Sequence, residues 1–222
     1  MTIQTEDPTE ALSQEYAEEL RHGRLTIPES AKKDIGLHEK ITAIRCSAGR
    51  SQLSAGSLTD SDFYAIDKLE AHLSKIRHVA VSIFIFDGCK LLLQRRADSK
   101  YHSAGLWANT VCSHPRWQES AGECASRRLN EELGWDVALS PFGAIDYSAQ
   151  VGDLYENEHV HCFHGKFNHQ HNVSDFNKSE VAEVQWLSIP EIIQAIKKQP
   201  ETFTEWFKIY MTEHRHMIEA LV

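Results

Sequence analysis

Two apolar runs surround an Asp-Gly turn near the middle of the chain. The first is HVAVSIFIF at 78–86 and the second is KLLLQRR at 90–96, with Asp87 and Gly88 between them. Runs of branched and aromatic residues are typical of β-strands, and an Asp-Gly turn between two such runs indicates a hairpin. We therefore expect a β-sheet to begin at His78.

A helix is expected at 119–133. Cys124, Ala125 and Leu129 recur at helical spacing within this stretch and can face the sheet, and Gly134 follows as a stop. The same stretch carries the acidic residues Glu119, Glu123 and Glu131. One interpretation is that they have no catalytic role and only form a solvated helix face paired with Arg127.

Strand-like runs recur around 144–147, 158–167 and 181–187, and two helices are expected to close the chain. The last helix is marked by apolar residues at a spacing of three and four. These are Phe203, Trp206, Phe207, Tyr210, Met211, Met217, Ile218 and Leu221. Strands interleaved with a few helices indicate an α/β layered fold with a mixed sheet.

The N-terminal part has a different character. An acidic helix is expected after the cap Asp7 and before Gly23, and residues 47–61 are rich in Ser and Gly, as in a loop or linker. We therefore divide the chain into a helical or loop extension at 1–60, of unknown role, and one folded domain at 61–222.

Composition narrows the class of partner. The 222 residues are 41% hydrophobic and 25% charged, enough for one sizeable core. The 23 basic and 32 acidic side chains give a formal charge of -9, which opposes attraction to nucleic acid and to anionic membranes. We expect neither partner, and the sequence leaves monomer or homodimer open.

The cellular compartment is predicted from the absence of a membrane-spanning run, of a secretory signal and of a disulfide pattern. No apolar run approaches the roughly 18 residues that cross a bilayer, and the opening MTIQTEDPTE has no basic or apolar segment of a secretory signal. The 5 cysteines are irregularly spaced without a CxxC pair, as expected of reduced thiols. These features predict a cytoplasmic protein.

The helical stretch and its flanks resemble the Nudix box, G-x5-E-x7-R-E-U-x-E-E-x-G-U with U an apolar residue. The corresponding positions are Ser113, Glu119, Arg127, Arg128, Leu129, Glu131, Glu132, Gly134 and Trp135. Ser113 replaces the Gly of the box, and Arg128 replaces a Glu that belongs to the metal-holding cluster in hydrolases with this fold. A cation there would repel metal and bind phosphate oxygens instead. The resemblance implies an α/β/α sandwich of the Nudix type, with a mixed β-sheet, that holds a diphosphate without cutting it.

A second resemblance covers roughly residues 65–210. Residues 108–115, ANTVCSHP, are similar to the NTxCxHP segment of type I isopentenyl-diphosphate isomerases, which share the Nudix fold. Other segments similar to that family follow in the same order. They are KLEAH at 68–72, RHVAVS at 77–82, QRRADSK at 94–100, ENE at 156–158, VQW at 184–186 and Trp206. The implied reaction is the interconversion of isopentenyl and dimethylallyl diphosphate.

This reaction protonates an alkene and removes a proton from the neighbouring carbon, so it needs two acid/base groups on opposite faces. The resemblance places Cys112 on one face and Glu156 on the other, with Tyr147 hydrogen-bonded near Glu156. Trp206 would stabilise the carbocation-like state with its π-face, unless it is only a core anchor of the last helix.

The resemblance also implies two sets of binding residues. Metal ligands are His72, His78, His114, Glu156 and Glu158, a set that suits Zn²⁺, Mn²⁺ or Mg²⁺. The diphosphate clamp consists of Lys68, Arg96, Lys100 and Arg128. A second, substrate-associated Mg²⁺ is expected between the diphosphate oxygens and Glu132.

Competing interpretations remain. A Nudix diphosphate hydrolase is disfavoured by Arg128, and an inactive metal-binding or interaction module has no use for both Cys112 and Glu156. A dense group could also form a rival metal site, and contains His159, His161, Cys162, His164, His169 and His171. On a strand, His159 and His161 would lie on the face opposite Glu156 and Glu158, so we interpret them as solvent-facing or core residues. We likewise interpret Cys89 and Cys124 as packing residues.

Overall fold

The computed structural model describes residues 39–45 and 59–222. The expected acidic helix after Asp7 and most of the expected loop at 47–61 lie outside these residues. The described strands are β1 (Lys40–Ile44), β2 (Phe63–Asp67), β3 (His78–Asp87), β4 (Lys90–Arg96), β5 (Trp107–Ala108), β6 (Val111–Ser113), β7 (Ser140–Val151), β8 (Leu154–Lys166) and β9 (Val181–Ser188). The described helices are α2 (Lys68–Leu73), α3 (Ala121–Leu133), α4 (Ile189–Lys198), α5 (Glu205–Glu213) and α6 (Arg215–Glu219), with 3-10 turns η5 (Asp60–Asp62) and η6 (Pro200–Thr202).

Strand β3 organises the sheet. Phe86 pairs with Leu91 and Asp87 with Lys90 across the turn to β4, so the predicted hairpin is confirmed. Strand β8 runs parallel to β3, whereas β1 and β6 pair with β3 in the antiparallel sense. The remaining pairs are all antiparallel: β1 with β2, β4 with β5, β4 with β9 and β7 with β8. The sheet is therefore mixed, as predicted.

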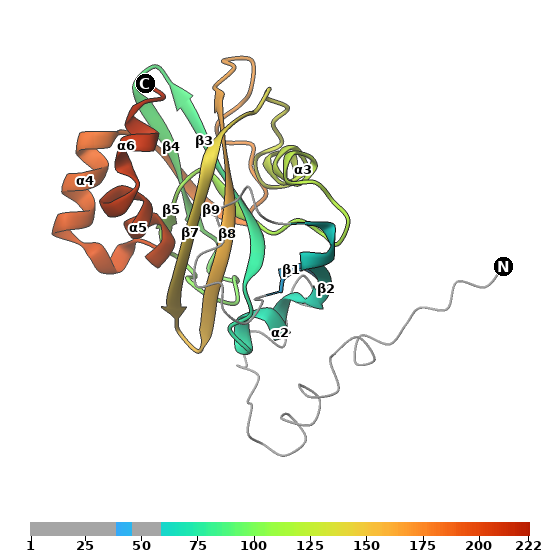
Figure 1. Cartoon of the computed structure of the whole chain (residues 1–222). Coiled ribbons are helices and arrows are strands. Elements are labelled where there is room, and N and C mark those ends of the chain that lie inside the picture. The colour runs from blue at the N-terminus through green and yellow to red at the C-terminus, as the bar shows by residue number, and fades with distance from the viewer. Residues whose placement is uncertain (1–38, 46–58) are drawn as a thin grey trace.

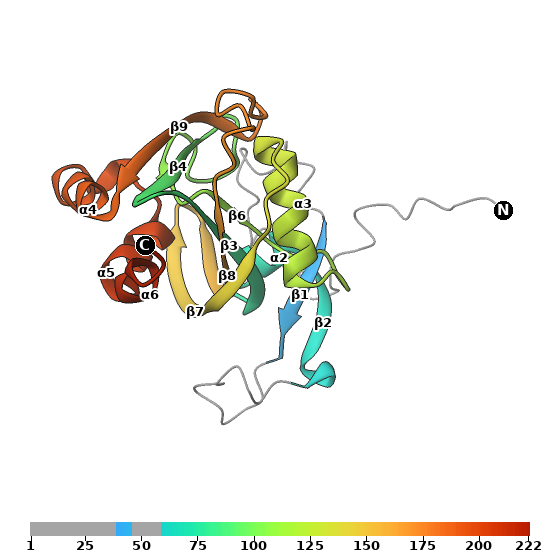
Figure 2. The same ribbon diagram turned by 90° about the horizontal axis from the view of Figure 1, so that it is seen from above.

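The sheet is covered on both faces. Phe84 and Phe86 of β3 belong to an apolar cluster with α4, α5 and α6, whereas Val81, Ile83 and Ile85 belong to a second cluster with α3. Successive side chains of a strand point to opposite faces, so a strand buried on both sides reads as a continuous apolar run. Figures 1 and 2 show α3 on one side of the sheet and α4, α5 and α6 on the other. This arrangement confirms the layered α/β fold.

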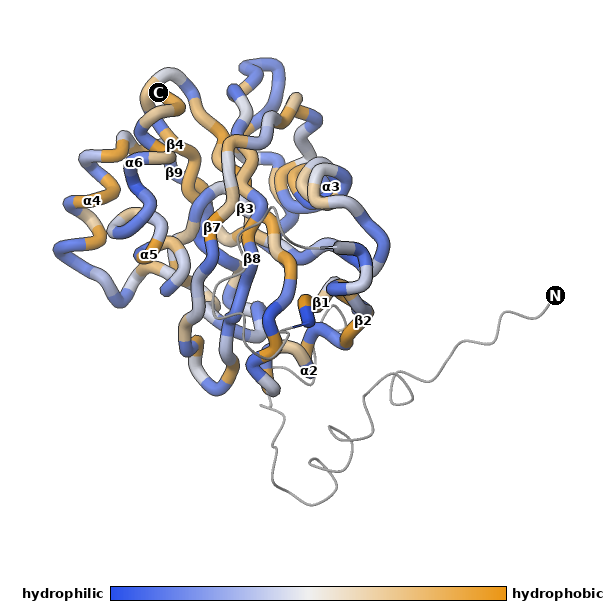
Figure 3. Tube along the Cα trace, viewed as in Figure 1, coloured by the Kyte–Doolittle hydropathy of each residue, from blue (hydrophilic) through white to orange (hydrophobic). Residues whose placement is uncertain are grey.

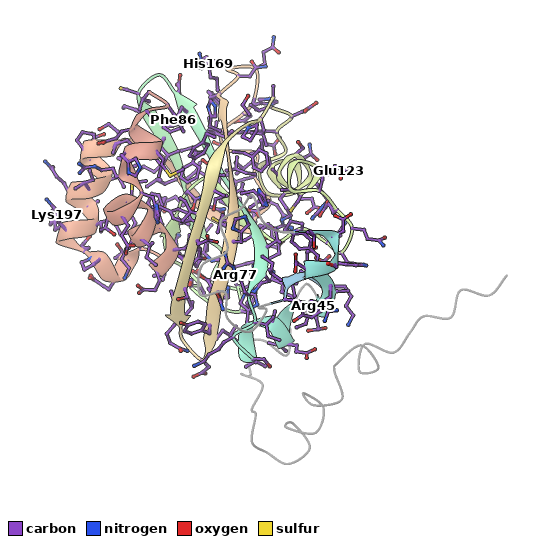
Figure 4. All side chains as sticks on the ribbon, in the orientation of Figure 1. Arg45, Arg77, Phe86, Glu123, His169 and Lys197 are labelled. Carbon is purple, nitrogen blue, oxygen red and sulfur yellow. The ribbon has the colours of Figure 1, made fainter. Side chains whose placement is uncertain are left out.

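Hydropathy follows these layers. In Figure 3 the hydrophobic colour gathers on the central strands and on the helix sides that face them. In Figure 4, Glu123 on α3 and Lys197 on α4 lie at opposite sides of the molecule, and both are exposed. Among the described residues, no helix has the length and apolar character needed to span a bilayer.

Helix α3 begins and ends where local chemistry dictates. The Ser120 hydroxyl accepts a hydrogen bond from the Glu123 amide at 3.2 Å, and the Glu123 carboxylate accepts one from the Ser120 amide at 2.9 Å. This reciprocal capping satisfies amides that the first helical turn leaves free. At the other end Gly134 adopts a left-handed conformation with φ of 70°. Cys124, Ala125 and Leu129 are buried, so the predicted helix and its sheet-facing residues are confirmed.

The C-terminal helix differs from its prediction in one respect. The apolar spacing predicted a single helix through Leu221, but the chain forms α5 and α6 with a break at His214, whose φ is -115°. Met211 and Ile218 nevertheless belong to the same apolar cluster. The break redirects α6 so that Ile218 remains in that cluster, and the periodicity alone could not reveal it.

Residues 40–44 also differ from expectation. They fall in the stretch assigned to a helical or loop extension, but they form β1, which pairs along its length with β2 and at Ala43 with His78 of β3. Ile41 and Ala43 are fully buried. A division of the chain near residue 60 stays a prediction, and β1 lies on the N-terminal side of it while being part of the sheet.

Candidate active site

Cys112 and Glu156, the two acid/base residues expected from the sequence, line one cavity. Cys112 lies on β6 and Glu156 on β8, and both strands pair with β3, which runs between them. Tyr147 of β7 and Trp206 of α5 line the same cavity. The fold therefore brings together residues that lie far apart in the sequence.

The Cys112 thiol is held by two polar neighbours. Its Sγ donates a hydrogen bond to Asn109 Oδ1 at 2.9 Å and lies 3.3 Å from Ser82 Oγ. Asn109 is fixed in turn, because its Nδ2 donates to the backbone oxygens of Ile83 and Val111, each at 3.1 Å. Burial raises the pKa of Cys112 to about 12, so the thiol is protonated at neutral pH.

Glu156 and Glu158 lie on one face of β8 and share a tyrosine. The Tyr147 hydroxyl lies 2.8 Å from Oε2 of each carboxylate. The register of β7 against β8 explains this contact, since Tyr147 stands opposite Glu158 and two residues from the partner of Glu156. Alternation along a strand thus delivers both carboxylates to the cavity.

The two carboxylates differ in their proton affinity. Burial, reinforced by the charge of Glu158, raises the pKa of Glu156 well above its usual value. Burial also opposes ionisation of Glu158, but the hydrogen bond from His114 at 2.9 Å and the nearby His78 ring outweigh it and hold the pKa of Glu158 well below the usual value. Two adjacent buried carboxylates repel each other when both are charged, so one favours the protonated form.

Four of the five predicted metal ligands form one compact group. The ligand atoms of His72, His78, His114 and Glu158 all lie within 4.8 Å of one another. His72 and His78 point their Nδ1 atoms to backbone oxygens, at 2.7 Å and 2.8 Å, which leaves their buried Nε2 atoms without a hydrogen-bond partner. Unpartnered buried nitrogens are costly unless something else binds them. This donor set therefore fits a divalent ion.

Two imidazoles of this group, those of His72 and His114, are neutral at physiological pH. Burial and the neighbouring His78 and His114 lower the pKa of His72 well below its usual value. Burial, followed by the charge of Lys68, lowers the pKa of His114 to about 4. Neutral imidazole is the form that ligates metal.

Glu156, the fifth predicted ligand, belongs to a second group. Its carboxylate lies within 4.8 Å of ligand atoms of His72 and His102. His102 was absent from the sequence-derived set. His72 is common to both groups, so the two groups adjoin in one cavity.

The predicted diphosphate clamp also lines this cavity. Lys68, Arg96, Lys100 and Arg128 all contribute to its wall, as does Glu132. Two of these cations share a carboxylate oxygen that the sequence did not single out, since Glu180 Oε2 lies 2.9 Å from Lys100 Nζ and 3.1 Å from an Arg128 nitrogen. Burial opposes ionisation of Glu180, but Lys100 and Arg128 lower its pKa.

Arg128 is surrounded by acidic groups. It bonds Glu131 at 2.8 Å and Glu132 at 2.7 Å in addition to Glu180. Glu132 also accepts a hydrogen bond from Gln94 at 2.9 Å. The Arg at this position of the Nudix box therefore pairs with three carboxylates, of which Glu132 and Glu180 also line the cavity.

Trp206 lies between the apolar core and the cavity. It is buried in the apolar cluster of α5 and also lines the cavity, where Arg96 lies over its ring at 5.3 Å. Its indole Nε1 is buried without a hydrogen-bond partner. A core anchor can thus also present a π-face to a ligand.

The rival histidine group does not converge on one point. His159 pairs with Asp146 at 2.7 Å, Cys162 belongs to the apolar cluster, and His169 lies on the surface near Asp87. In the ranges 39–45 and 59–222, the only groups suited to a metal are the two that contain His72. The interpretation of these histidines as core or surface residues agrees with this placement.

The structure also supports a purely structural role for the carboxylates of Glu119, Glu123 and Glu131. Glu119 and Glu131 bond Arg127 at 2.6 Å and 3.0 Å, and Glu123 caps the helix through Ser120. Cys124 is buried as a packing residue, whereas Cys89 is exposed in the turn between β3 and β4. The packing role expected for Cys89 is therefore wrong, because a hairpin turn leaves its side chain in solvent.

Comparison with known proteins places the chain in a family. The NUDIX domain model matches residues 76–207. A curated protein of Dinoroseobacter shibae named isopentenyl-diphosphate Delta-isomerase is 45% identical, with 73% of this chain and 93% of that protein covered. The chain belongs to the isopentenyl-diphosphate Delta-isomerase family. Isomerases of the same name from Cereibacter sphaeroides and Rhodobacter capsulatus are 43% and 44% identical, with 69% of this chain covered by each and 87% and 88% of those proteins.

Solved structures agree on the fold. A Deinococcus radiodurans protein superposes with a TM-score of 0.52 at 14% identity, with 72% of this chain and 90% of that chain covered. A MutT protein from Methanosarcina mazei gives 0.51 at 19% identity, with 65% and 95% covered. At this identity the likeness concerns the fold alone, and the isomerase family is set by the curated relatives.

Proposed function

We propose that the protein interconverts isopentenyl diphosphate and dimethylallyl diphosphate. The observation that carries this proposal is that Cys112 and Glu156 line one cavity together with Lys68, Arg96 and Lys100. The family relationship supports it, since several curated relatives carry that activity in their name. A cationic wall beside two acid/base groups suits a substrate with a diphosphate at one end and an alkene at the other.

Cys112 begins the forward reaction as the proton donor. Its thiol is held protonated by burial, and the hydrogen bonds to Asn109 and Ser82 fix its direction. The S–H bond breaks and a C–H bond forms at the terminal alkene carbon, which leaves a tertiary carbocation-like centre. In the reverse reaction the thiolate takes this proton back.

Glu156 accepts the proton from the neighbouring carbon. Tyr147 holds Oε2 of this carboxylate, which orients the group. Its raised pKa means that the carboxylate form needs an opposing positive charge. A divalent ion beside Glu156, held by His72, His78, His114 and Glu158, would supply that charge when bound.

The rest of the cavity stabilises the charged species. The Trp206 π-face would favour the carbocation-like centre by about 0.5–2 kcal/mol, a small part of the 8 kcal/mol or more that enzymes commonly supply. Positioning by the clamp of Lys68, Arg96, Lys100 and Arg128 and exclusion of water supply most of the remainder. We assign Glu132 to a substrate-associated Mg²⁺, since magnesium favours few carboxylates plus phosphate. The resident ion of the His/Glu group is Zn²⁺, Mn²⁺ or Mg²⁺, and a cytoplasmic location stays a prediction.

The direct test is product analysis with two substrates. Purified protein with Mg²⁺ is incubated with isopentenyl diphosphate, and separately with nucleoside diphosphate derivatives. We expect dimethylallyl diphosphate from the first and no phosphate release from the second. Phosphate release without isomerisation would identify a Nudix hydrolase and overturn the proposal.

A further inference from the structure

His102 lies in the segment between β4 and β5 and faces the cavity of the candidate active site. Its side chain is 7% exposed. The ring stands edge-on to Trp206, with centroids 5.8 Å apart, and edge-on to Tyr101 at 4.3 Å. An Arg96 nitrogen donates to its backbone oxygen at 3.2 Å. Aromatic packing orients the imidazole, and the hydrogen bond holds the backbone that carries it.

The two ring nitrogens of His102 face different partners. Nδ1 lies 3.2 Å from the Ser103 hydroxyl, and Nε2 lies 3.7 Å from Glu156 Oε1. That second distance is too long for a hydrogen bond. It is instead the separation of two atoms that can bind a common ion, because ligands of one first-row metal lie roughly 3 Å apart or somewhat more when each is about 2 Å from it.

His72 completes this arrangement. Its Nδ1 is engaged by the Lys68 backbone oxygen at 2.7 Å, and its fully buried Nε2 has no hydrogen-bond partner. This nitrogen lies within 4.8 Å of the ligand atoms of His102 and Glu156. It also belongs to the group of His78, His114 and Glu158. One nitrogen cannot ligate two ions at once, so the two groups offer alternative positions to one ion.

We propose that His102 is a further metal ligand and that, with His72 and Glu156, it forms a second position for a divalent ion in this cavity. Two imidazoles and one carboxylate suit a first-row transition ion such as Mn²⁺, Fe²⁺, Co²⁺ or Zn²⁺ and leave coordination positions open. The first position, with three imidazoles and Glu158, offers more protein ligands and so leaves fewer coordination positions open. An ion in the second position would contact Glu156 directly. The metal site itself does not depend on the proposed function, but its effect on catalysis does.

The test measures Mn²⁺ binding by full-length, chelator-treated protein without substrate. All variants are made in a His114→Gln parent, which lacks a ligand of the first position only. In that parent, His102→Gln is compared with the parent itself and with His161→Gln, which alters a half-buried histidine outside both groups. Free Mn²⁺ is followed by continuous-wave EPR, and imidazole nitrogens bound to Mn²⁺ by pulsed EPR. His102→Asn is measured in parallel, and circular dichroism identifies which of the two variants retains the fold.

We expect His102→Gln and His102→Asn to weaken Mn²⁺ binding by the His114→Gln parent at least about tenfold and to remove part of its imidazole modulation, while His161→Gln does neither. Affinity within twofold of the parent, or unchanged modulation, would overturn the proposal. Loss of affinity with unchanged modulation would mean that His102 only orients another ligand. The proposed function is judged separately by the isomerase activity of the unmodified protein. Mn²⁺ binding through His102, together with an unmodified protein that does not isomerise, would contradict that function alone.

Discussion

Cys112 illustrates how the surroundings of a residue set its chemical form. Most reactive cysteines lie in electropositive, partly exposed places where the thiolate is favoured. Cys112 instead lies among Ser82, Asn109 and apolar side chains, and burial raises the pKa of its thiol to about 12. This environment suits a residue that begins as a proton donor and is poorly suited to a nucleophile.

Replacement of Cys112 tests the donor role. We expect Cys112→Ala to abolish turnover while leaving metal content unchanged, because the thiol is absent from both metal groups. Cys162→Ala is the matched control, since that thiol is buried in the apolar cluster and does not line the cavity. Near-normal turnover by Cys112→Ala, measured alongside metal analysis, would show that another group donates the proton.

Arg128 supports a prediction about stability. Its guanidinium pairs with Glu132, whose side chain is 4% exposed, so Arg128→Met leaves a buried carboxylate unpaired. We expect a loss of about 3 kcal/mol in the free energy of unfolding. Arg116→Met provides the comparison, because the Arg116–Glu39 pair is 49% and 41% exposed and should contribute less than about 1 kcal/mol. Urea denaturation of both variants measures the difference, and equal losses would contradict this view of Arg128.

At the scale of elements, the sequence predicted best where local chemistry alone decides. The hairpin of β3 and β4 was predicted from an Asp-Gly turn, and the end of α3 from a terminal glycine. The Ser120 cap was not used, so the helix was expected from 119, whereas α3 begins at Ala121. Strand β1 carries no comparable local signal, and its identity as a strand depends on pairing with β2. The break between α5 and α6 is likewise invisible to an apolar spacing that both helices share.

Gly122 in α3 and Gly134 just after it give opposite predictions for the same substitution. Gly134 has φ of 70°, where an added Cβ is unfavourable, so Gly134→Ala should destabilise the protein by about 1 kcal/mol. Gly122 lies within α3, and an added Cβ there would have no heavy atom within 4 Å. Gly122→Ala should therefore stabilise the protein by about 0.5–1 kcal/mol. Thermal denaturation checks both signs. Destabilisation by Gly122→Ala would mean that the low helix propensity of this glycine does not reduce the stability of α3.

At the scale of the molecule, motifs predicted the residues that meet in the cavity, but not all of its wall. Cys112, His114 and Glu156 belong to segments that resemble the isomerase family, and the structure brings them together. His102 and Glu180 were missed because their roles arise from contacts across the fold. His102 meets Glu156 from a loop, and Glu180 meets Lys100 and Arg128 from the residue before β9.

The buried histidines predict how the whole molecule responds to acid. His72, His102 and His114 have lowered pKa values, chiefly through burial, so between pH 6.5 and 4 the unfolded chain binds protons that the folded chain does not. Their contribution to stability is present above pH 6.5 and is lost as the pH falls. His114, with its pKa lowered to about 4, alone accounts for about 2 kcal/mol between pH 7 and pH 5.

Glu156 acts in the opposite direction, because its raised pKa makes the folded chain take up a proton in this range. One carboxyl does not offset three imidazoles, so we expect chelator-treated protein to be less stable at pH 5 than at pH 7. Urea denaturation at the two pH values measures the change. Equal or greater stability at pH 5 would mean that the imidazoles are not held neutral in the fold.

Proton transfer at two carbon atoms of one substrate is the central claim, and an isotope experiment tests it most directly. Isopentenyl diphosphate and Mg²⁺ are incubated with the protein in heavy water, where the Cys112 thiol exchanges to S–D, and the products are followed by NMR. We predict deuterium in the new methyl group of dimethylallyl diphosphate. Release of inorganic phosphate without deuterium in any methyl group would contradict the account.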